Sequence, residues 1–590
     1  MCGIIGCVSD KDCCGALYDG LKRLEYRGYD SAGIAVLGKT LSVCKKKGGV
    51  SNLSGFYAAG GTGIGHTRWA THGAPSDANA HPHTSGGFAL VHNGIVENYA
   101  ALKEELEGEG EVFSSETDSE VIVKLIARYF EGDFLGAVAR AVGRLEGSYA
   151  IAVICEKFPG ELVAAKKKSP LVAGEGRGGL FVCSDIPALS GIADYIAKAE
   201  DGEFVHIAKG EINFYDRALR PLSKTFFRTQ EELRGAAVAG GGYFMRAEIA
   251  EIPRALSDTL SSLEDKDFAP CARILRGAKR VFAVACGTAY HSALVFRDTV
   301  EREAGIPVVC HTAGEFRYRP ALVGPQDAVV AVSQSGETAD TLEAAYLARS
   351  RGAFVIAVTN IGSSTLAAAA DFTLVMRAGA EIAVAATKSY NCQLLCLLYL
   401  AAQLVFFKKD RFPDWFSALS SLAEGASAAM DCFSETDRLA DRLKKARAIY
   451  YLGRGTDLCT AREGALKVKE IACVFAEGYP AGELKHGSLA LVEEGFPVIC
   501  VSTQKNLIKK SENALAEVRS RGGFCVLFSQ YREALADSCA QFSCLLPTLP
   551  EPLMPVVSVI PLQYFAYKMC IERGLDPDKP RNLAKSVTVE

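Results

Sequence analysis

The chain has 590 residues, enough for three or four folding units and a substantial core. Hydrophobic residues make up 49% and charged residues 23%, a globular balance that excludes a largely disordered chain. Lys and Arg number 65 against 69 Asp and Glu, which gives a formal net charge of −4. Because there is no basic excess, nucleic acid is not expected as a main partner.

The sequence predicts a soluble protein of the cytoplasm, without a membrane-bound part. The chain does not open with a charged region and a long apolar run, so no signal peptide is expected. The most apolar stretch, 394–407, contains Gln403 and is shorter than the roughly 18 residues of a membrane span, which predicts a buried helix. The twenty cysteines are scattered without a C-x-x-C pair, which favours free and mostly buried thiols in a reducing compartment.

The first 225 or so residues are rich in glycine and contain short strand-like runs separated by turn residues. This pattern predicts an antiparallel sheet domain with some helices. The predicted strands lie at 3–8, 32–37, 89–91 and 149–155. A small-residue stretch at 236–242 (AAVAGGG) then predicts a linker.

Beyond the linker, apolar strand-like runs alternate with Ala- and Leu-rich helical segments, which predicts parallel α/β units. This part repeats itself. Thr288 in VFAVACGT and Thr456 in IYYLGRGT are 168 residues apart, and two AGE triplets have the same spacing. We therefore expect two copies of one doubly wound α/β domain. The expected boundaries are 1–228 for the first domain, 229–255 for the linker, 265–410 and 440–575 for the two copies, and 576–590 for a C-terminal tail.

Cys2 is the first residue with chemistry to consider. If Met1 is removed, Cys2 carries a thiol and an α-amine, and the amine can serve as the base for the thiol. The ordinary alternative is an incidental cysteine after the start codon.

Other polar residues in the first 120 positions suit an amino-acid substrate. Arg68 and Asp118 could bind its carboxylate and its ammonium group. The side chain of Asn93 and the backbone N–H of Gly94 could form a two-donor oxyanion hole. Asn-Gly is also a strong hairpin-turn signal, which is the alternative.

These residues stand in motifs that resemble a known family. The motifs are MCGIIG, RLEYRGYDSAG, GTGIGHTRWATHG, NAHPH, HNGIVEN and SETD. They resemble the class II glutamine amidotransferase domains, which are N-terminal nucleophile hydrolases with an αββα sandwich fold. The resemblance implies Cys2 as nucleophile and Asn93 with Gly94 as oxyanion hole. It places Arg68, Thr71, His72 and Asp118 on glutamine, Trp69 at the passage of ammonia, and Arg27 and His81 in supporting roles.

The five histidines between 66 and 92 raise the question of a metal. His81 and His83 could chelate one, but no Cys or carboxylate accompanies them at the spacing of a zinc site. We expect no metal and no cofactor.

The first α/β copy contains a candidate phosphate loop. Ser333, Gln334, Ser335 and Thr338 follow an apolar run and precede a predicted helix at 339–349. Hydroxyls and backbone N–H groups at a helix N-terminus can bind phosphate, although a Ser-rich helix cap is the plain alternative. The aligned segment 501–505 lacks the glycine and the acidic residue, so only the first copy is expected to bind phosphate.

The second copy places three charged residues on one helix face. Glu463, Lys467 and Glu470 have i, i+4 and i+7 spacing, which in isolation is typical of a solvated face with an ion pair. His486 follows in ELKHG, and Lys585 lies in the tail, NLAKSVTVE.

The whole chain resembles class II amidotransferases that carry two sugar isomerase (SIS) domains, through ACGT, EFRYRP, SQSGETADTL, EGALKVKE, AGELKHG and PRNLAKSVTVE. The resemblance implies conversion of fructose 6-phosphate and glutamine to glucosamine 6-phosphate and glutamate, the first step of amino sugar nucleotide (UDP-GlcNAc) synthesis, by a bacterial-type homodimer. It implies that Lys585 forms a Schiff base, Glu470 moves a proton between C1 and C2, and His486 of a neighbouring subunit assists ring opening. It gives Glu463 and Lys467 auxiliary roles. It implies that the 6-phosphate is bound by Ser333, Gln334, Ser335 and Thr338, and that the sugar contacts Thr288 and Val384.

Two departures and two alternatives remain. Ala289 and Ala386 stand where the family often has serine, which removes a hydroxyl near the expected phosphate and sugar. A deglycase acting on another sugar amine would not need Cys2 and its companions. A sugar-phosphate-sensing regulator would not need Lys585 and Glu470, and no DNA-binding motif is evident.

Overall fold

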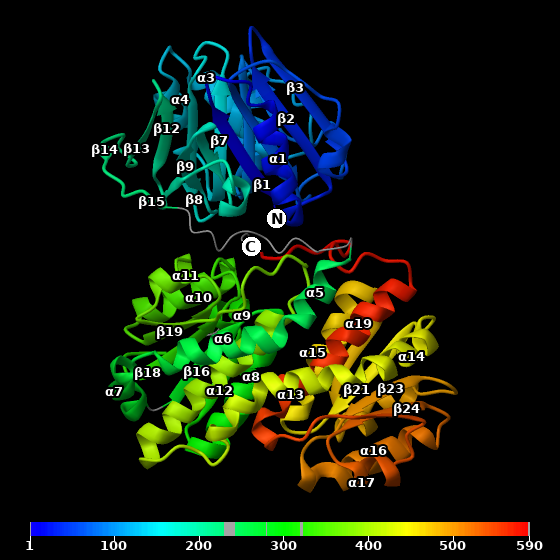
Figure 1. Cartoon of the computed structure of the whole chain (residues 1–590). Helices are drawn as coiled ribbons and strands as arrows, with labels where there is room; N and C mark the ends of the chain where they lie inside the picture. Colours follow the sequence, from blue (N-terminus) through cyan, green and yellow to red (C-terminus); the bar gives the residue numbers. More distant parts are fainter. Residues whose placement is uncertain (1, 229–241, 279, 319–322, 588–590) are drawn as a thin grey trace. The chain divides into compact units, whose positions relative to one another are not determined.

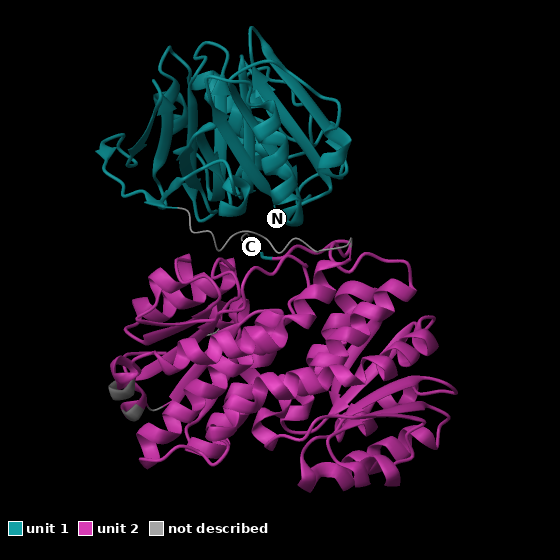
Figure 2. Cartoon of the chain, in the orientation of Figure 1, with its two compact units in different colours: residues 1–235, 586–590 teal, residues 236–585 magenta. Residues whose placement is uncertain are grey.

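The computed structural model describes residues 2–228, 242–278, 280–318 and 323–587. The chain divides into two compact units, residues 1–235 with 586–590 and residues 236–585 (Figure 2). Most of the predicted linker at 236–242 lies outside the described residues.

The first unit contains two antiparallel sheets, as the strand pattern predicts. One sheet has the order β15-β11-β9-β10-β1-β4-β2-β3 and the other β14-β13-β12-β8-β7-β6-β5. The strands of the first sheet are β1 (Gly3–Val8), β2 (Ser31–Leu37), β3 (Leu41–Lys47), β4 (Thr62–Arg68), β9 (Val172–Gly176), β10 (Gly179–Cys183), β11 (Tyr195–Lys198) and β15 (Phe227–Arg228). Those of the second are β5 (His83–Ser85), β6 (Phe88–Val96), β7 (Gly147–Cys155), β8 (Leu162–Lys167), β12 (Phe204–Ala208), β13 (Glu211–Tyr215) and β14 (Pro221–Leu222).

Alternation along the strands builds a four-layer αββα sandwich (Figure 1). On β1, Ile4 points into the core between the two sheets, whereas Ile5 points to the opposite face and packs with α1 (Cys14–Leu24). The outer face of the second sheet packs against α3 (Ser119–Tyr129) and α4 (Phe134–Val142), with α2 (Tyr99–Gly108) beside them. Each sheet therefore has one face toward the other sheet and one face covered by helices, because successive side chains of a strand point to opposite sides. The predicted fold class is confirmed for this unit.

The second unit contains two parallel five-stranded sheets with the same strand order. Their orders are β17-β16-β18-β19-β20 and β22-β21-β23-β24-β25. The first comprises β16 (Arg280–Ala285), β17 (Val308–Thr312), β18 (Asp327–Val332), β19 (Phe354–Thr359) and β20 (Phe372–Val375); the second comprises β21 (Ala448–Gly453), β22 (Phe475–Pro480), β23 (Pro497–Val501), β24 (Phe524–Ser529) and β25 (Phe542–Leu545). The predicted repeat of a parallel α/β domain is confirmed.

Helices cover both faces of each parallel sheet. A large shared core joins the two copies through α8 (Gly287–Ala304), α12 (Lys388–Lys409), α15 (Thr456–Ala472) and α19 (Ile560–Glu572). The remaining helices of this unit are α5 (Phe244–Ala250), α6 (Ile252–Glu264), α7 (Ala269–Gly277), α9 (Ala313–Tyr318), α10 (Ala339–Ser350), α11 (Thr365–Ala369), α13 (Leu422–Ala429), α14 (Phe433–Leu443), α16 (Ile508–Arg519), α17 (Arg532–Asp537) and α18 (Met554–Ser558). Because α5 begins at Phe244, the range 229–255 expected as linker includes helix.

Two helical segments, Lys388–Lys409 and Glu551–Glu572, are long and apolar enough to cross a membrane by length and composition alone. In each, 89% of the apolar window is buried inside the protein. Core helices pass the same test, so this is weak evidence for a membrane span. The prediction of a buried helix over 394–407 is confirmed, within a longer helix than its apolar run suggested.

Candidate active site

Cys2 lies directly before β1, next to the end of β4. The backbone N–H of Trp69 donates to its Sγ at 3.3 Å, and Sγ lies 3.5 Å from the carbonyl oxygen of Trp69. Burial raises the pKa of the Cys2 thiol, and the Trp69 N–H and the charge of Arg68 only partly offset this. The thiol is therefore the resting form, and a base has to take its proton before it can attack.

Asn93 and Gly94 lie on β6 beside Cys2. Nδ2 of Asn93 donates to the carbonyl oxygen of Cys2 at 3.1 Å. Gly94 has φ +138°, and a Cβ there would lie 2.1 Å from the carbonyl oxygen of Ser148, so no other residue fits without moving the backbone. The pair is part of a strand rather than of a hairpin turn, which removes the alternative interpretation of Asn-Gly.

His66, on β4, fixes the orientation of Asn93. Its Nε2 lies 3.1 Å from Oδ1 of Asn93 and 2.9 Å from the carbonyl oxygen of His92. Both partners accept, so Nε2 must carry the hydrogen. Burial lowers the pKa of His66 to about 3, which keeps the ring neutral. The sequence analysis did not identify His66 as a site residue. Its position two residues before Arg68 on the same strand could have indicated it.

The residues expected on glutamine surround these groups. Arg68 donates to the carbonyl oxygens of His72 and Gly73, the latter at 3.0 Å. Its buried Nη1 and the buried Nδ1 of His72 have no hydrogen-bond partner in the described part of the chain. Asp118 accepts from the backbone N–H of Val96 at 2.8 Å. Unpaired buried donors are what the carboxylate of a bound amino acid would satisfy.

The other expected residues of this site have structural surroundings of their own. Thr71 is exposed, and the ring of Trp69 meets the ring of Tyr29 edge to face at 5.9 Å. Arg27 donates to the carbonyl oxygen of Cys2 at 3.2 Å and pairs with Asp185 at 2.5 Å. The sequence did not indicate Asp185.

His81 is buried, and its ring lies 4.2 Å from the ring of His66 and 4.6 Å from that of His83. Burial holds the pKa of His81 well below its usual range, so it is neutral. Among the described residues, no group of three or more His, Cys, Asp or Glu side chains could hold a metal ion.

In the second unit, the predicted phosphate loop connects β18 to α10. Ser333 Oγ lies 2.9 Å from Thr338 Oγ1 and accepts from the N–H of Gly336 at 3.1 Å. Gly336 has φ +65°, and a Cβ there would lie 2.1 Å from Ser364 Oγ. The backbone of Gln334 accepts from the N–H of Asn360 at 3.0 Å. Ser335 Oγ accepts from the N–H of Glu337 at 3.1 Å. The loop is thus held from within, at the carboxyl end of a central strand, where ligands bind in open parallel sheets.

The charged face of α15 is a buried network and not a solvated surface. Glu463 and Lys467 have no exposed surface. Lys467 Nζ lies 3.2 Å from Glu463, 2.6 Å from Glu470 and 2.9 Å from Thr288 Oγ1, and Thr288 donates to Glu463 at 3.1 Å. Although burial disfavours its ammonium form, the two carboxylates raise the pKa of Lys467. The ordinary interpretation, a solvated face with an ion pair, therefore does not hold for Glu463 and Lys467.

The sequence missed His291, a further member of this network. It lies on α8, and its Nδ1 is 2.7 Å from Oε2 of Glu463. Burial would raise the pKa of Glu463, but Lys467 and His291 lower it below the usual range. The motif ACGT ends three residues before His291, which was the available signal.

Lys585 meets a second buried group of charges. Its Nζ lies 2.5 Å from Oε2 of Glu381, which has no exposed surface. Glu381 also accepts from the N–H groups of Thr387 and Ser389 and from Ser389 Oγ, at 2.9, 3.1 and 2.7 Å. Despite burial, Lys585 lowers the pKa of Glu381 to about 2, whereas burial first and Glu381 second raise the pKa of Glu248 to about 7. Neither carboxylate was predicted from the sequence.

The tail before Lys585 is fixed by Asp578. Its carboxylate accepts from the N–H groups of Phe244 and Met245, both at 2.8 Å, at the start of α5. Its carbonyl oxygen accepts from the N–H of Val384 at 3.3 Å. The expected sugar contact Val384 is therefore close to the tail in space.

His486 is not joined to these groups within one chain. It ends a short 3-10 helix, Glu483–His486, and is exposed. No described residue forms a hydrogen bond with its side chain.

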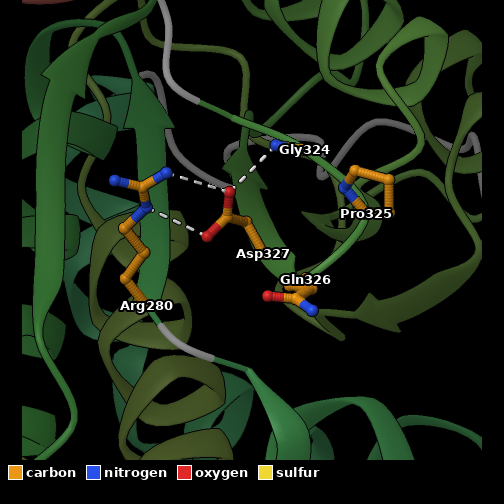
Figure 3. A pocket seen from close by; sticks show the side chains of 5 residues that line it. All are labelled: Arg280, Gly324, Pro325, Gln326 and Asp327. Atoms are coloured by element: carbon orange, nitrogen blue, oxygen red, sulfur yellow. Dashed lines mark hydrogen bonds and ion pairs between the residues drawn. The ribbon is translucent and has the colours of Figure 1, made fainter.

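A cavity of about 530 Å³ lies away from these residues. It is lined by Arg280, Gly324, Pro325, Gln326 and Asp327 (Figure 3). Arg280 Nε lies 3.0 Å from Asp327, which also accepts from the N–H of Gly324 at 2.9 Å. This is the amino end of β16 and β18, opposite to the end where the phosphate loop and Thr288 lie, so the cavity is not part of the candidate site.

Comparison with known proteins divides the chain into the same domains. A glutamine amidotransferase domain model matches residues 40–239, and a SIS domain model matches residues 274–403 and 442–573. The chain is 46% identical over 610 residues to glutamine–fructose-6-phosphate aminotransferase (isomerizing) of Symbiobacterium thermophilum and 42% identical over 608 residues to that of Caldanaerobacter subterraneus subsp. tengcongensis, with all of both chains covered each time. The chain belongs to the glutamine–fructose-6-phosphate aminotransferase (isomerizing) family.

A solved structure of this family matches the second unit. The C-terminal domain of glucosamine-fructose-6-phosphate aminotransferase from Francisella tularensis is 32% identical, with a TM-score of 0.56, and the match covers 58% of this chain and all of that one. The predictions of a glutamine amidotransferase domain and two SIS domains are confirmed.

Proposed function

We propose that the chain converts fructose 6-phosphate and glutamine to glucosamine 6-phosphate and glutamate; its relatives are named glutamine–fructose-6-phosphate aminotransferase (isomerizing). The observation that carries the proposal is the network of Glu463, Lys467, Glu470 and Thr288, in which Glu463 and Lys467 have no exposed surface and Glu470 is 21% exposed. A carboxylate that solvent and substrate can reach, at the edge of buried charges, is suited to proton transfer between neighbouring carbons of a sugar.

The first step is the release of ammonia from glutamine. Cys2 Sγ attacks the amide carbon and forms a thioester while ammonia leaves, and water then frees glutamate. The α-amine of Cys2, after removal of Met1, takes the thiol proton that burial otherwise retains. Nδ2 of Asn93 and the N–H of Gly94 stabilise the oxyanion, and the neutral His66 holds Asn93 in position for this.

Substrate binding follows from the unpaired donors. Arg68 and His72 take the carboxylate of glutamine, and Asp118 takes its ammonium group, with Thr71 and Trp69 closing over it. Arg27 and His81 support the backbone and rings around the nucleophile.

The second step takes place on the sugar. Ser333, Gln334, Ser335 and Thr338 bind the 6-phosphate with the N-terminus of α10, while Thr288 and Val384 contact the sugar. Lys585 Nζ adds to C2 and loses water, and ammonia then replaces the lysine to give the imine of the sugar. Glu470 removes a proton from C1 and returns it to C2, which gives the 2-amino aldose. No cofactor is needed, because the imine itself stabilises the charge.

Lys585 has to give up a proton before it can add to a carbonyl. Glu381 is in contact with its ammonium, and Glu248, whose pKa is about 7, lies in the same buried group. The Glu381 carboxylate, whose pKa is about 2, holds the ammonium, so proton transfer to Glu248 frees the amine.

The assembly we propose is a homodimer in the cytoplasm, in which His486 of one subunit assists ring opening in the other. The exposure of His486 in a single chain supports this, because a partner can reach it. The twenty free cysteines fit a reducing compartment. The functional divisions are 1–228, 265–410, 440–575 and the tail 576–590.

One assay tests the proposal. Purified chain with fructose 6-phosphate and glutamine should form glucosamine 6-phosphate and glutamate in equal amounts. A deglycase would release ammonia from amino sugars without glutamine, and a regulator would bind sugar phosphate without turnover. Either of these two results would replace the proposal.

A further inference from the structure

His291 occupies the border between the buried charge network and a small cavity. The cavity has a volume of about 320 Å³, and its lining includes Tyr290, His291, Arg462, Lys469 and Glu477. All of these residues belong to the second unit. The side chain of His291 is 15% exposed, whereas Glu463 beside it is completely buried. His291 is therefore the member of this contact that solvent can reach.

The two nitrogens of the ring have different surroundings. Nδ1 lies 2.7 Å from Oε2 of Glu463 and donates to it, because a carboxylate can only accept. Among the residues that the structure describes, none forms a hydrogen bond with Nε2, and the His291 ring lines the cavity. A carboxylate that holds one nitrogen while the other faces a cavity orients an imidazole for proton exchange.

We propose that His291 is a positioning residue for the isomerase reaction, and that it links the charge network to solvent. The Nδ1–H of His291 fixes the Glu463 carboxylate, which also accepts a hydrogen bond from Thr288 and forms an ion pair with Lys467. The Nε2 of His291 exchanges a proton with solvent in the cavity. This inference rests on the proposed function and adds a residue to it.

The charge of the network explains why such a link matters. With His291 neutral, two carboxylates and one ammonium give Glu463, Lys467 and Glu470 a net charge of −1. One proton on Nε2 brings the group to zero and adds a cation near Glu470, which makes Glu470 a weaker base. Proton transfer between C1 and C2 therefore becomes slower as His291 is protonated.

Other ionisable groups face the same ring. On α15 these are Arg462, Lys467 and Lys469 besides Glu463; Tyr290 precedes His291 on α8, Glu477 comes from β22, and Tyr390 of α12 faces Glu463. Among the side-chain types named here, only imidazole has a reference pKa between 5 and 8. His486 is a second imidazole proposed for this reaction, and the test therefore rests on differences between variants.

Two substitutions separate positioning from titration. His291→Gln retains an N–H donor for Glu463 but cannot be protonated. His291→Phe retains the ring volume but has no donor. Tyr290→Phe is the matched control, because it changes the neighbouring wall of the cavity without touching Glu463.

The measurement is amino sugar formation by the full chain at saturating glutamine from pH 5.5 to 8.5, together with glutaminase activity in the same preparations. We expect His291→Phe to lower kcat for amino sugar by about tenfold or more with little change in KM for fructose 6-phosphate. His291→Gln should keep kcat within about threefold at pH 8 and decline less than the wild type below pH 6.5. Tyr290→Phe should follow the wild-type profile.

The inference is overturned if His291→Phe keeps the wild-type kcat, or if the profile of His291→Gln coincides with that of the wild type. If His291→Phe does not fold, the Gln profile alone decides. A wild-type chain that forms no glucosamine 6-phosphate overturns the proposed function itself. This result differs from an active wild-type chain whose His291 variants are equally active, which overturns only the inference on His291.

Discussion

At the scale of single residues, burial decides which interpretation of a charged pattern holds. Glu463 and Lys467 have the spacing of an ordinary surface ion pair, yet neither has exposed surface. A buried charge is tolerated only with partners, and Lys467 has two carboxylates and a hydroxyl. The loss of Lys467 would leave the two carboxylates without their cation, so a neutral residue of similar size cannot replace it.

The first prediction concerns the nucleophile. Cys2→Ala removes the thiol that attacks glutamine and leaves the residues of the second unit unchanged. We expect loss of glutaminase and of glutamine-dependent amino sugar formation, with conversion of fructose 6-phosphate to the aldose phosphate retained. Both activities are measured on one preparation. A folded variant that also lacks isomerisation would contradict the division of labour between the two units.

The second prediction concerns Glu381. Glu381→Gln removes the negative charge beside Lys585, which makes the neutral amine easier to form. Borohydride trapping of fructose 6-phosphate on Lys585 should therefore reach its half-maximal extent about one pH unit lower than in the wild type.

Ser389→Ala is the control for this experiment. It removes one hydrogen bond to Glu381 at 2.7 Å but keeps the ion pair with Lys585. Its trapping curve should coincide with the wild-type curve. A Gln curve that is unchanged or moves to higher pH, or a label found on Lys467 or Lys388, would refute the role given to Glu381 and Lys585.

At the scale of elements, the sequence predicts most of the architecture because its signals are local. The run 3–8 matches β1, and the interval between Thr288 and Thr456 reveals the repeat of the two parallel sheets. Glu381 and Asp185 escaped prediction because their partners Lys585 and Arg27 are 204 and 158 residues away in the chain. Contacts of that kind depend on how elements pack, which no local pattern contains.

In the second α/β copy, the loop that corresponds to the candidate phosphate loop forms hydrogen bonds with a side chain of the protein itself. Asp457 stands in α15 where the aligned position of the first copy is Ala289. Its carboxylate accepts from the backbone N–H of Thr503 at 2.8 Å and from Thr503 Oγ1 at 2.5 Å. An internal anion thus accepts from both donors of Thr503, which agrees with the expectation that only the first copy binds phosphate.

The third prediction concerns pH and the buried Glu248 of α5. The folded-state pKa of Glu248 is raised from its ordinary 4.5 to about 7 by burial and by Glu381. The stabilisation is therefore complete below pH 4.5 and is lost as the pH rises through 7, because ionisation of Glu248 is costly in the folded state. Glu248→Gln stays neutral, so its thermal unfolding midpoint at pH 8 should exceed that of the wild type by about 2 °C and match it at pH 5.

The control for Glu248 is its neighbour Glu251. This carboxylate pairs with Lys388 at 2.5 Å, so Glu251→Gln removes an attraction and should not raise the midpoint at pH 8. Thermal unfolding of the full chain followed at both pH values gives the answer. A Glu248→Gln variant that is less stable than the wild type at pH 8 would contradict the assigned cost.

At the scale of the whole molecule, a single chain joins only some of the residues that we propose for the sugar site. One chain joins Thr288, Glu463, Lys467 and Glu470, and separately Lys585 and Glu381, by hydrogen bonds and ion pairs. His486 remains exposed. The physical question for the assembly is whether a second chain supplies this imidazole.

Subunit complementation answers the question, and it is the fourth prediction. Lys585→Arg cannot form an imine because guanidinium stays protonated, and His486→Asn removes the imidazole. Each variant alone should be nearly inactive in amino sugar formation.

If His486 acts across the interface, a mixed dimer contains one site with both defects and one site with neither. Co-expression in equal amounts should then restore about a quarter of wild-type activity, since about half of the dimers are mixed and half of their sites are intact. If His486 acts within its own chain, every site of a mixed dimer carries one defect and activity stays at the level of the single variants. That second outcome would refute the shared site, and glutaminase activity, expected to be unchanged in all preparations, serves as the control for folding.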